Sequence, residues 1–368
     1  MKHKHYRPLL YLAGIVTVFQ LLCSFLGMEF YLTQVIMSAY YSLVVLGLCL
    51  LMGHAGQISL GHAGFFAIGG YTSAFLTTVN LLPYAEQGLF PLFRASGVIT
   101  ERTDLYGNPL LSFSPWFACC IALLLTVLVA FLIGMPVLKL KGHYLAMATL
   151  GFGIIIQTIV VGTRFLGEAD GITRVPPFYL LPFLPVTGKT SLRILNYYIA
   201  WLLVLAALVA ALNLVYSRIG RAFKAIHSSE EAARAMGVNT PRYKLHVFVT
   251  SAVFASLGGI FLTHYNAGIG PSEAGVIKSV RYVALVAAGG MDNIWSSLLM
   301  GVVLNFLSLR GLFGTYDDIV FGLILIAMML FAPKGLLRAG MLSVPLNFIR
   351  QKLKLKNKAK DENGKSAA

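Results

Sequence analysis

Two glycine-rich stretches carry polar side chains into otherwise apolar parts of this 368-residue chain. Glycine weakens a helix, and amide, hydroxyl, imidazole and carboxylate groups can bind water or a polar solute but find no partner in apolar surroundings. We therefore predict that both stretches line one polar path; for the first stretch, a tight cytoplasmic turn between two helices is the alternative. The path residues expected from residues 53–64 and 289–295 are Gly53, Gly56, Gln57, Ser59, Gly61, His62, Gly289, Gly290 and Asp292.

A third polar stretch, residues 228–237, has the sequence pattern of a short helix. Ser228 and Glu231 have the spacing of a capping box, which predicts that a helix begins there. Gly237 is placed to end that helix in a left-handed turn. Ala232 and Ala233 are small enough to let another surface approach closely. The pattern predicts a short helix that contacts a partner, and an ordinary amphipathic loop helix is the alternative.

The sequence does not indicate a catalytic, metal or nucleotide site. His54 and His62 have no carboxylate or thiol within their own polar stretch that would complete a metal site. Residues 188–190 (Gly-Lys-Thr) resemble the end of a phosphate-binding loop, but Phe183 stands where that loop requires a glycine. The acidic pair at 317–318 is isolated. We therefore expect a chain that is not an enzyme and that binds no metal or cofactor itself.

The composition indicates a membrane protein. Apolar residues make up 57% of the chain and charged residues 12%, against about 25% charged residues in a soluble domain. These values exclude cytosolic enzymes, nucleic-acid-binding proteins and disordered proteins. Because a span needs about 20 apolar residues, we expect an all-α polytopic membrane protein with about ten transmembrane helices, some of them broken. The expected spans are 8–28, 31–52, 61–80, 116–138, 142–162, 197–217 and 245–266, with about two or three more in 279–333.

The basic residues indicate which ends of the spans face the cytoplasm. The net charge is +15, and the excess of Lys and Arg gathers at both termini and in two internal segments, 139–141 and 217–244. Because short basic loops stay in the cytoplasm, we predict that both termini are cytoplasmic. Successive spans cross the membrane in opposite directions. Starting from a cytoplasmic N-terminus, this places two long proline-containing loops, 81–115 and 163–196, on the outside.

We assign residues 1–349 to a single transmembrane domain, with 217–244 as a cytoplasmic loop within it. Residues 350–368 are expected to form a basic, disordered cytoplasmic tail. Its lysines are either solvated or in contact with anionic lipid headgroups. Two charged residues, Arg281 and Asp292, lie within the apolar stretch 279–333. They mark either a functional site or an interfacial ion pair.

Several motifs are together similar to one family of membrane transporters. Glu231-Ala232-Ala233, followed by Gly237, resembles the EAA loop of ABC-importer permeases, which docks on the ATPase subunit. Residues 53–71 (GHAGQISLGHAGFFAIGGY) resemble the signature of branched-chain amino acid ABC transporter permeases of the LivM/LivH type. The further similar motifs lie at 142–150, 169–171, 220–259 and 331–336. The resemblance covers most of residues 30–340, although the 81–115 loop looks longer than usual and the proline-containing end of the EAA pattern is not seen after Lys244.

The resemblance implies a transport subunit without an ATPase site of its own. The implied function is translocation of branched-chain or related amino acids across the bacterial cytoplasmic (inner) membrane; a permease for urea or short amides, or a stand-alone secondary carrier, is the alternative. The implied partners are two ABC ATPase subunits that use ATP, a second homologous permease, a periplasmic substrate-binding protein and membrane lipid, but no nucleic acid. The implied ATPase-coupling residues in 217–244 are Glu230, Glu231, Ala232, Ala233, Gly237 and Arg221.

Overall fold

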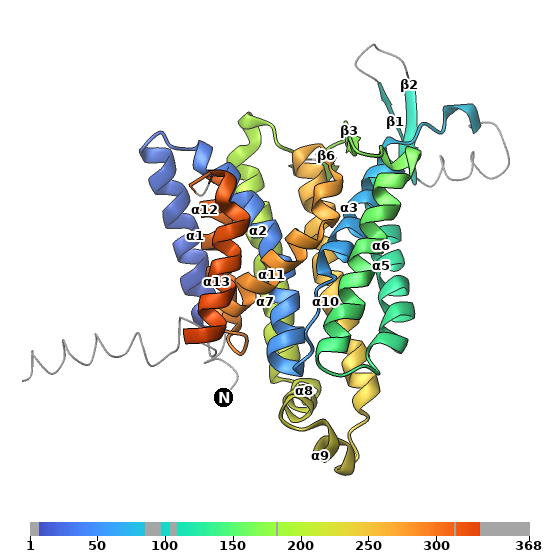
Figure 1. Ribbon diagram of the computed structural model, residues 1–368. Helices are drawn as coiled ribbons and strands as arrows, with labels where there is room; N and C mark the ends of the chain where they lie inside the picture. Colours follow the sequence, from blue (N-terminus) through green and yellow to red (C-terminus); the bar gives the residue numbers. More distant parts are fainter. Residues whose placement is uncertain (1–6, 85–96, 104–108, 182, 313, 332–368) are drawn as a thin grey trace, which may run out of the picture.

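The computed structural model describes residues 7–84, 97–103, 109–181, 183–312 and 314–331, and this part of the chain is mostly helical (Figure 1). Its long helices are α1 (Arg7–Phe25), α2 (Phe30–Leu48), α5 (Pro115–Val137), α6 (His143–Gly162), α7 (Arg193–Tyr216) and α10 (Thr240–Asn266). Its shorter helices are α3 (His62–Thr78), α8 (Arg218–Ser228), α9 (Glu230–Ala235), α11 (Val276–Gly289), α12 (Ile294–Leu309) and α13 (Asp317–Phe331). The predictions for the tail 350–368 and for the motif beyond Phe331 lie outside the described residues.

Six helices in the described ranges are long and apolar enough to cross a membrane. They cover Pro8–Phe25, Phe30–His54, Pro115–Val137, His143–Gly162, Thr190–Tyr216 and Thr240–Asn266. Each coincides with an expected span, so the helical membrane class is confirmed. The remaining helices of the bundle, α3, α11, α12 and α13, are shorter and run among these six (Figure 1). The expectation of about ten crossings therefore stays a prediction.

Three short antiparallel strand pairs occur within the described loops, and the all-helical expectation did not include them. The pairs are β1 (Ile99–Thr103) with β2 (Pro109–Phe113), β3 (Ile172–Thr173) with β6 (Gly268–Ile269), and β4 (Phe178–Tyr179) with β5 (Pro185–Val186). The labelled strands lie at one end of the bundle, and α8 and α9 lie at the other (Figure 1). This arrangement agrees with the sequence-based assignment of the long loops and the basic segment to opposite sides.

The centre of the bundle is formed by α2, α3 and α10, which approach one another through glycines. A Cβ atom added at Gly259 of α10 would overlap the carbonyl oxygen of Phe66 in α3. One added at Gly258 would come within 2.7 Å of the carbonyl oxygen of Tyr40 in α2. Small residues at helix crossings let the two backbones come into van der Waals contact. In a membrane this contact drives helix association, because lipid is as apolar as the side chains and their burial gains little. The second half of α2 is completely enclosed, since every residue from Ser38 to Leu48 is buried.

Substitution of Gly259 by alanine tests this close packing. We expect Gly259→Ala to destabilise the folded protein by about 1–3 kcal/mol, because the added methyl group forces α10 away from α3. The matched control is Gly151→Ala, since Gly151 is also helical but its Cβ would meet no atom within 4 Å. Thermal unfolding of both variants in mild detergent is the measurement. Equal stability of the two variants contradicts the assigned role of the glycine contact.

Candidate functional site

The structure brings the two predicted polar stretches into contact near the end of the bundle that carries α8. The last residues of the second span, Cys49–His54, form a π-helical turn. The Cys49 thiol donates a hydrogen bond of 3.2 Å to the carbonyl oxygen of Met291. Gly53 lies against the same carbonyl group, which a Cβ atom would overlap. Sequence reasoning placed both stretches along one path without predicting this contact between them.

Residues 289–293 form a tight turn between α11 and α12. Gly289 lies so close to the backbone of Ser297 that a side chain would overlap it, and Gly290 has a positive φ of 89° that favours glycine. The Ser297 hydroxyl donates to the Gly290 carbonyl at 3.1 Å. Asn293 then caps α12 by accepting from the backbone of Trp295. Asp292 is exposed at the tip of this turn.

Ser59, Gly61 and His62 take part in helix packing. The Ser59 hydroxyl and the Nδ1 atom of His62 are 3.0 Å apart, and the Nε2 atom of His62 is 2.6 Å from the hydroxyl of Ser251 in α10. Gly61 faces the carbonyl oxygen of Thr149 in α6, which a Cβ would approach to 2.5 Å. The hydrogen-bonding capacity of His62 is thus used inside the bundle, at 1% exposure. These residues fix the start of α3 against α6 and α10.

Gly56 and Gln57 lie between the π-helical turn and α3. Unlike Ser59 and His62, they take no part in side-chain hydrogen bonds among the described residues. Gly56 has a positive φ of 67°, and its Cβ would come within 3.0 Å of the His227 ring at the end of α8. Gln57 is 3% exposed, and neither atom of its side-chain amide has a partner among the described residues. A buried amide with spare hydrogen-bonding capacity suits a place that admits water or a polar solute. The His227 contact joins this place to the basic segment.

The basic segment folds into two short helices at one end of the bundle. Ser217 caps α8, and the buried side of α8 contains Phe223 and Ile226, as the apolar pattern indicated. Arg221 is exposed on the opposite side of α8. Phe223 packs edge-on against Tyr243 of α10, with ring centroids 6.3 Å apart. The segment therefore contacts the central helix through apolar groups and presents its charges outward.

The helix α9 begins one residue later than the capping-box pattern indicated. Ser229, and not Ser228, accepts the capping hydrogen bond from the backbone of Ala232. Ser228 instead still belongs to α8, where its hydroxyl donates to the Lys224 carbonyl. The end of α9 is as predicted: Gly237 has a φ of 84°, and the following residue donates back to the carbonyl of Ala233 in a Schellman arrangement.

The two glutamates at the start of α9 have different environments. Glu230 forms an ion pair with Lys244 of α10, whose side chain is 10% exposed, and it also bonds to Arg234 and Thr240. Burial alone would raise the pKa of the Glu230 carboxyl, but the Lys244 ammonium and the Thr240 hydroxyl together hold it below its ordinary value. Glu231 is 89% exposed, with Lys141 at 3.6 Å. Glu230 therefore attaches α9 to α10. Glu231, Ala232 and Gly237 are exposed, whereas Ala233 is buried.

The partners of Arg281 were missed from the sequence. Arg281 does not pair with Asp292; its guanidinium donates to Asp318 at 2.7 Å and lies 3.7 Å from Asp317. The acidic pair that looked isolated in the sequence is therefore the counter-charge of Arg281. On the same helix, Lys278 pairs with Glu273 at 2.9 Å. The three-residue spacing of Lys278 and Arg281 places both cations on one helix face but does not indicate their partners.

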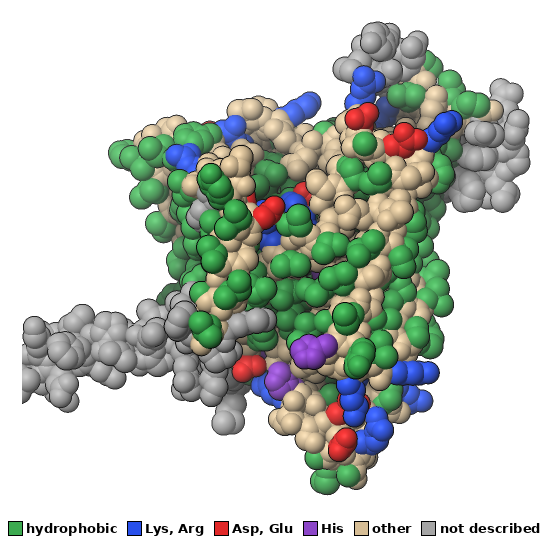
Figure 2. Space-filling view, in the orientation of Figure 1, with side chains coloured by type: hydrophobic (Ala, Val, Ile, Leu, Met, Phe, Trp, Pro, Cys, Tyr) green, Lys and Arg blue, Asp and Glu red, His purple; other side chains and the backbone are tan. Residues whose placement is uncertain are grey.

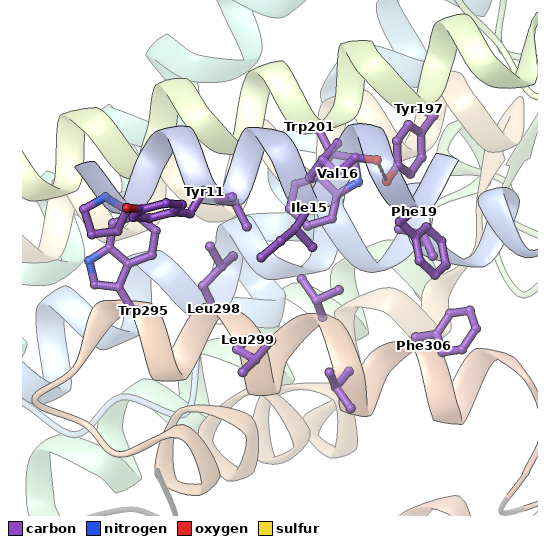
Figure 3. Close-up of a pocket in the computed structure, with 15 residues that line it drawn as sticks. Tyr11, Ile15, Val16, Phe19, Tyr197, Trp201, Trp295, Leu298, Leu299 and Phe306 are labelled. Carbon is purple, nitrogen blue, oxygen red and sulfur yellow. Dashed lines mark hydrogen bonds between the residues drawn. The ribbon is translucent and has the colours of Figure 1, made fainter. Parts of the chain in front are cut away.

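An apolar groove of about 480 Å³ lies between α1, α2, α7 and α12, away from all of these polar groups. Figure 3 shows Tyr11 and Trp295 toward one end of it and Tyr197, Phe19 and Phe306 toward the other. Tyr197 donates to the backbone of Val16 at 2.9 Å. The lining contains none of the predicted path residues. It suits hydrocarbon, not a polar solute.

The Glu230–Lys244 pair predicts a pH-dependent stability. Because the pKa of Glu230 is lowered in the folded state, its contribution is present at neutral pH and is lost as the pH falls through that lowered value. We expect Glu230→Gln to cost about 1–3 kcal/mol at pH 7, because it leaves the Lys244 ammonium without its counter-charge. The difference from the unmodified protein should close on acidification. Glu231→Gln, at an exposed site, is the control and should change stability little at any pH.

Comparison with known proteins shows that the chain is similar to transport permeases. The family model described as "Branched-chain amino acid transport system / permease component" matches residues 30–329. The high-affinity branched-chain amino acid transport system permease protein LivM of Escherichia coli is 30% identical over 339 residues, covering 87% of this chain and 70% of that protein. The LivM protein of Salmonella typhimurium is 30% identical over 321 residues, which cover 82% of this chain and 68% of that protein.

A second type of permease is also related to the chain. The LivH permease protein of Escherichia coli is 24% identical over 313 residues, covering 82% of this chain and 92% of that protein. No solved structure matches the chain. The matched region contains both polar stretches and the α8–α9 segment. The chain therefore belongs to the family of permease components of branched-chain amino acid transport systems.

Proposed function

We propose that this chain is a membrane permease subunit of an ATP-driven importer, and that it translocates branched-chain or related amino acids across the bacterial cytoplasmic membrane. Family membership supports the transport function. The α8–α9 segment supports the dependence on a partner, because it presents exposed Arg221 and Glu231 at the end of the bundle. A carrier that works alone has no need of such a segment.

The α8–α9 segment is connected to the bundle in two ways, and both support a coupling role. The ion pair of Glu230 and Lys244 ties α9 to α10. The contact of His227 with Gly56 ties α8 to the polar stretch between the second span and α3. When ATP closes the ATPase pair, movement of α8 and α9 is passed to α10 and to the path. Differential contacts in the two states supply the coupling energy.

The full assembly that we propose has several other subunits. Two ABC ATPases dock on α8 and α9, a second homologous permease completes the membrane part, and a periplasmic binding protein delivers the amino acid. ATP is used by the ATPases, and this chain holds no cofactor. We further propose that α3, α11, α12 and α13 cross the membrane with the six long helices, which makes about ten crossings and leaves both termini in the cytoplasm.

Substitution of Gly237 tests the coupling role. We expect Gly237→Val to lower ATP-dependent amino-acid uptake by at least about tenfold, because a β-branched residue cannot hold the positive φ that ends α9. Membrane insertion should be unaffected. The measurement is uptake by proteoliposomes that contain the whole complex, with the binding protein supplied.

The matched control for this experiment is Gly311→Val. Gly311 has a similar φ of 74° and equally open surroundings, but it lies beyond α12, far from α8 and α9 in the fold. Equal loss of uptake in both variants points to general strain and removes the support for coupling. Proton-driven uptake by this chain alone overturns the importer proposal.

A further inference from the structure

We propose that a small polar pocket among α2, α11 and α12 binds the ammonium and carboxylate groups of a zwitterionic amino acid during its passage. The proposal rests on the transport function proposed above and adds to it a binding site for the substrate. The pocket has a volume of about 20 Å³. The residues that line it are Tyr41, Lys278, Arg281, Tyr282, Asn305, Ser308 and Leu309.

The pocket lies toward the end of the bundle opposite α8 and α9. In Figure 1, α13 begins toward that end, and α11 lies near the middle height of the bundle. Figure 2 shows acidic and basic side chains gathered in a hollow on a face that is otherwise largely apolar. In the orientation proposed above, this is the external half of the membrane, where a substrate arrives.

Two cations line the pocket, and carboxylates beside it pair with them. The Lys278 ammonium donates to the Glu273 carboxylate at 2.9 Å and to the Tyr41 hydroxyl at 3.3 Å. The Arg281 guanidinium donates to the Ser308 hydroxyl at 3.2 Å and pairs with Asp318. Charged groups within a membrane domain are expensive and mark solute paths by default. Here two cations of α11 lie one helical turn apart, and each is paired with a carboxylate from another segment.

Several polar atoms of this cluster have no hydrogen-bond partner within the described part of the chain. They are the hydroxyl of Tyr282, Oε2 of Glu273, Nε of Arg281 and Oδ1 of Asp317. Tyr282 is 1% exposed, so its hydroxyl cannot be satisfied by bulk solvent. An unsatisfied buried group costs about 1–3 kcal/mol. The cluster thus retains both donors and acceptors for a ligand that offers the complementary groups.

The balance of charges favours a zwitterion over other solutes. A zwitterion adds no net charge, and its carboxylate can replace Glu273 on Lys278 while its ammonium takes the released carboxylate. Every charge stays paired in this exchange, as a low-dielectric site requires. An anion alone would leave Glu273 without a cation, and a neutral amide needs neither charge. Before the substrate binds, Lys278 and Glu273 therefore neutralise each other, and on binding each pairs with one charged group of the substrate.

Aromatic rings next to the charges suit an apolar side chain. Tyr41 stacks on Phe66 with ring centroids 5.7 Å apart, and Tyr282 lies 6.2 Å from Tyr41 and 6.4 Å from Phe66. The volume of the pocket holds about one water molecule. Binding of an amino acid therefore requires α11 to separate from α12. The glycine turn at 289–290 joins these two helices and can absorb that change.

The test uses the complete complex with its binding protein in proteoliposomes, with L-leucine as the zwitterionic probe and urea as the neutral one. We expect Lys278→Met and Glu273→Gln each to lower ATP-dependent leucine uptake at least tenfold. The control is Lys189→Met, an exposed lysine in the 163–196 loop, which should leave uptake within twofold. Leucine uptake by the Lys278→Met variant within twofold of the unmodified complex overturns the proposal and leaves the pocket as a place for ordered water.

A variant with the two charges exchanged distinguishes a role of the ion pair in substrate binding from a role in folding alone. The double variant Glu273→Lys with Lys278→Glu keeps an ion pair and should restore thermal stability in detergent. If the pair is only structural, leucine uptake returns as well, and the proposal is wrong. If the pair binds the substrate, uptake stays low because the charge pattern around the fixed Arg281 is reversed. A complex that shows no ATP-dependent transport in its unmodified form, or that transports urea but not leucine, contradicts the proposed function itself.

Discussion

The backbone contact between α2, α3 and α10 is the constraint on which the rest of this structure depends. In a membrane, apolar side chains gain little by leaving lipid for protein, so helices associate through close van der Waals packing and internal polar contacts. The glycines on α10 provide that approach, and the buried pair of His62 and Ser251 adds a polar contact between α3 and α10. The other helices are arranged around this centre. The irregular segment before α3 is tolerated because its polar side chains, those of Gln57 and Ser59, are buried in protein.

The central position of α10 connects the short α8–α9 segment to the whole bundle. Lys244 lies in its first turns and binds Glu230, whereas Ser251 and Gly259 further along contact α3. Movement of α9 is therefore applied to the helix that has the most extensive packing. The second connection, from His227 to Gly56, is smaller but reaches the polar stretch directly. The two connections begin on adjacent short helices, and they end on α10 and on the polar stretch at Gly56.

Features set by local rules could be predicted from the sequence, and features set by distant contacts could not. The long spans and the left-handed end of α9 at Gly237 depend on a few neighbouring residues and agree with the structure. The start of α9 was misplaced by one residue because Ser228 and Ser229 are both good caps, and only the extension of α8 decides between them. The pairing of Arg281 with Asp318 joins residues far apart in the sequence. No periodicity or motif indicates such a pair before the fold is known.

The unbroken length of α10 has a mechanical consequence. Its 27 residues make a rod roughly 40 Å long. Its first turns are attached to α9, and its other end continues into β6, which pairs with β3, and then into the segment that contains Glu273. A lever of this length turns a tilt of a few degrees into a displacement of a few ångströms at its far end. A single helix therefore connects the β3–β6 strand pair, the segment that contains Glu273 and the α8–α9 segment, so that a tilt of α10 displaces all three.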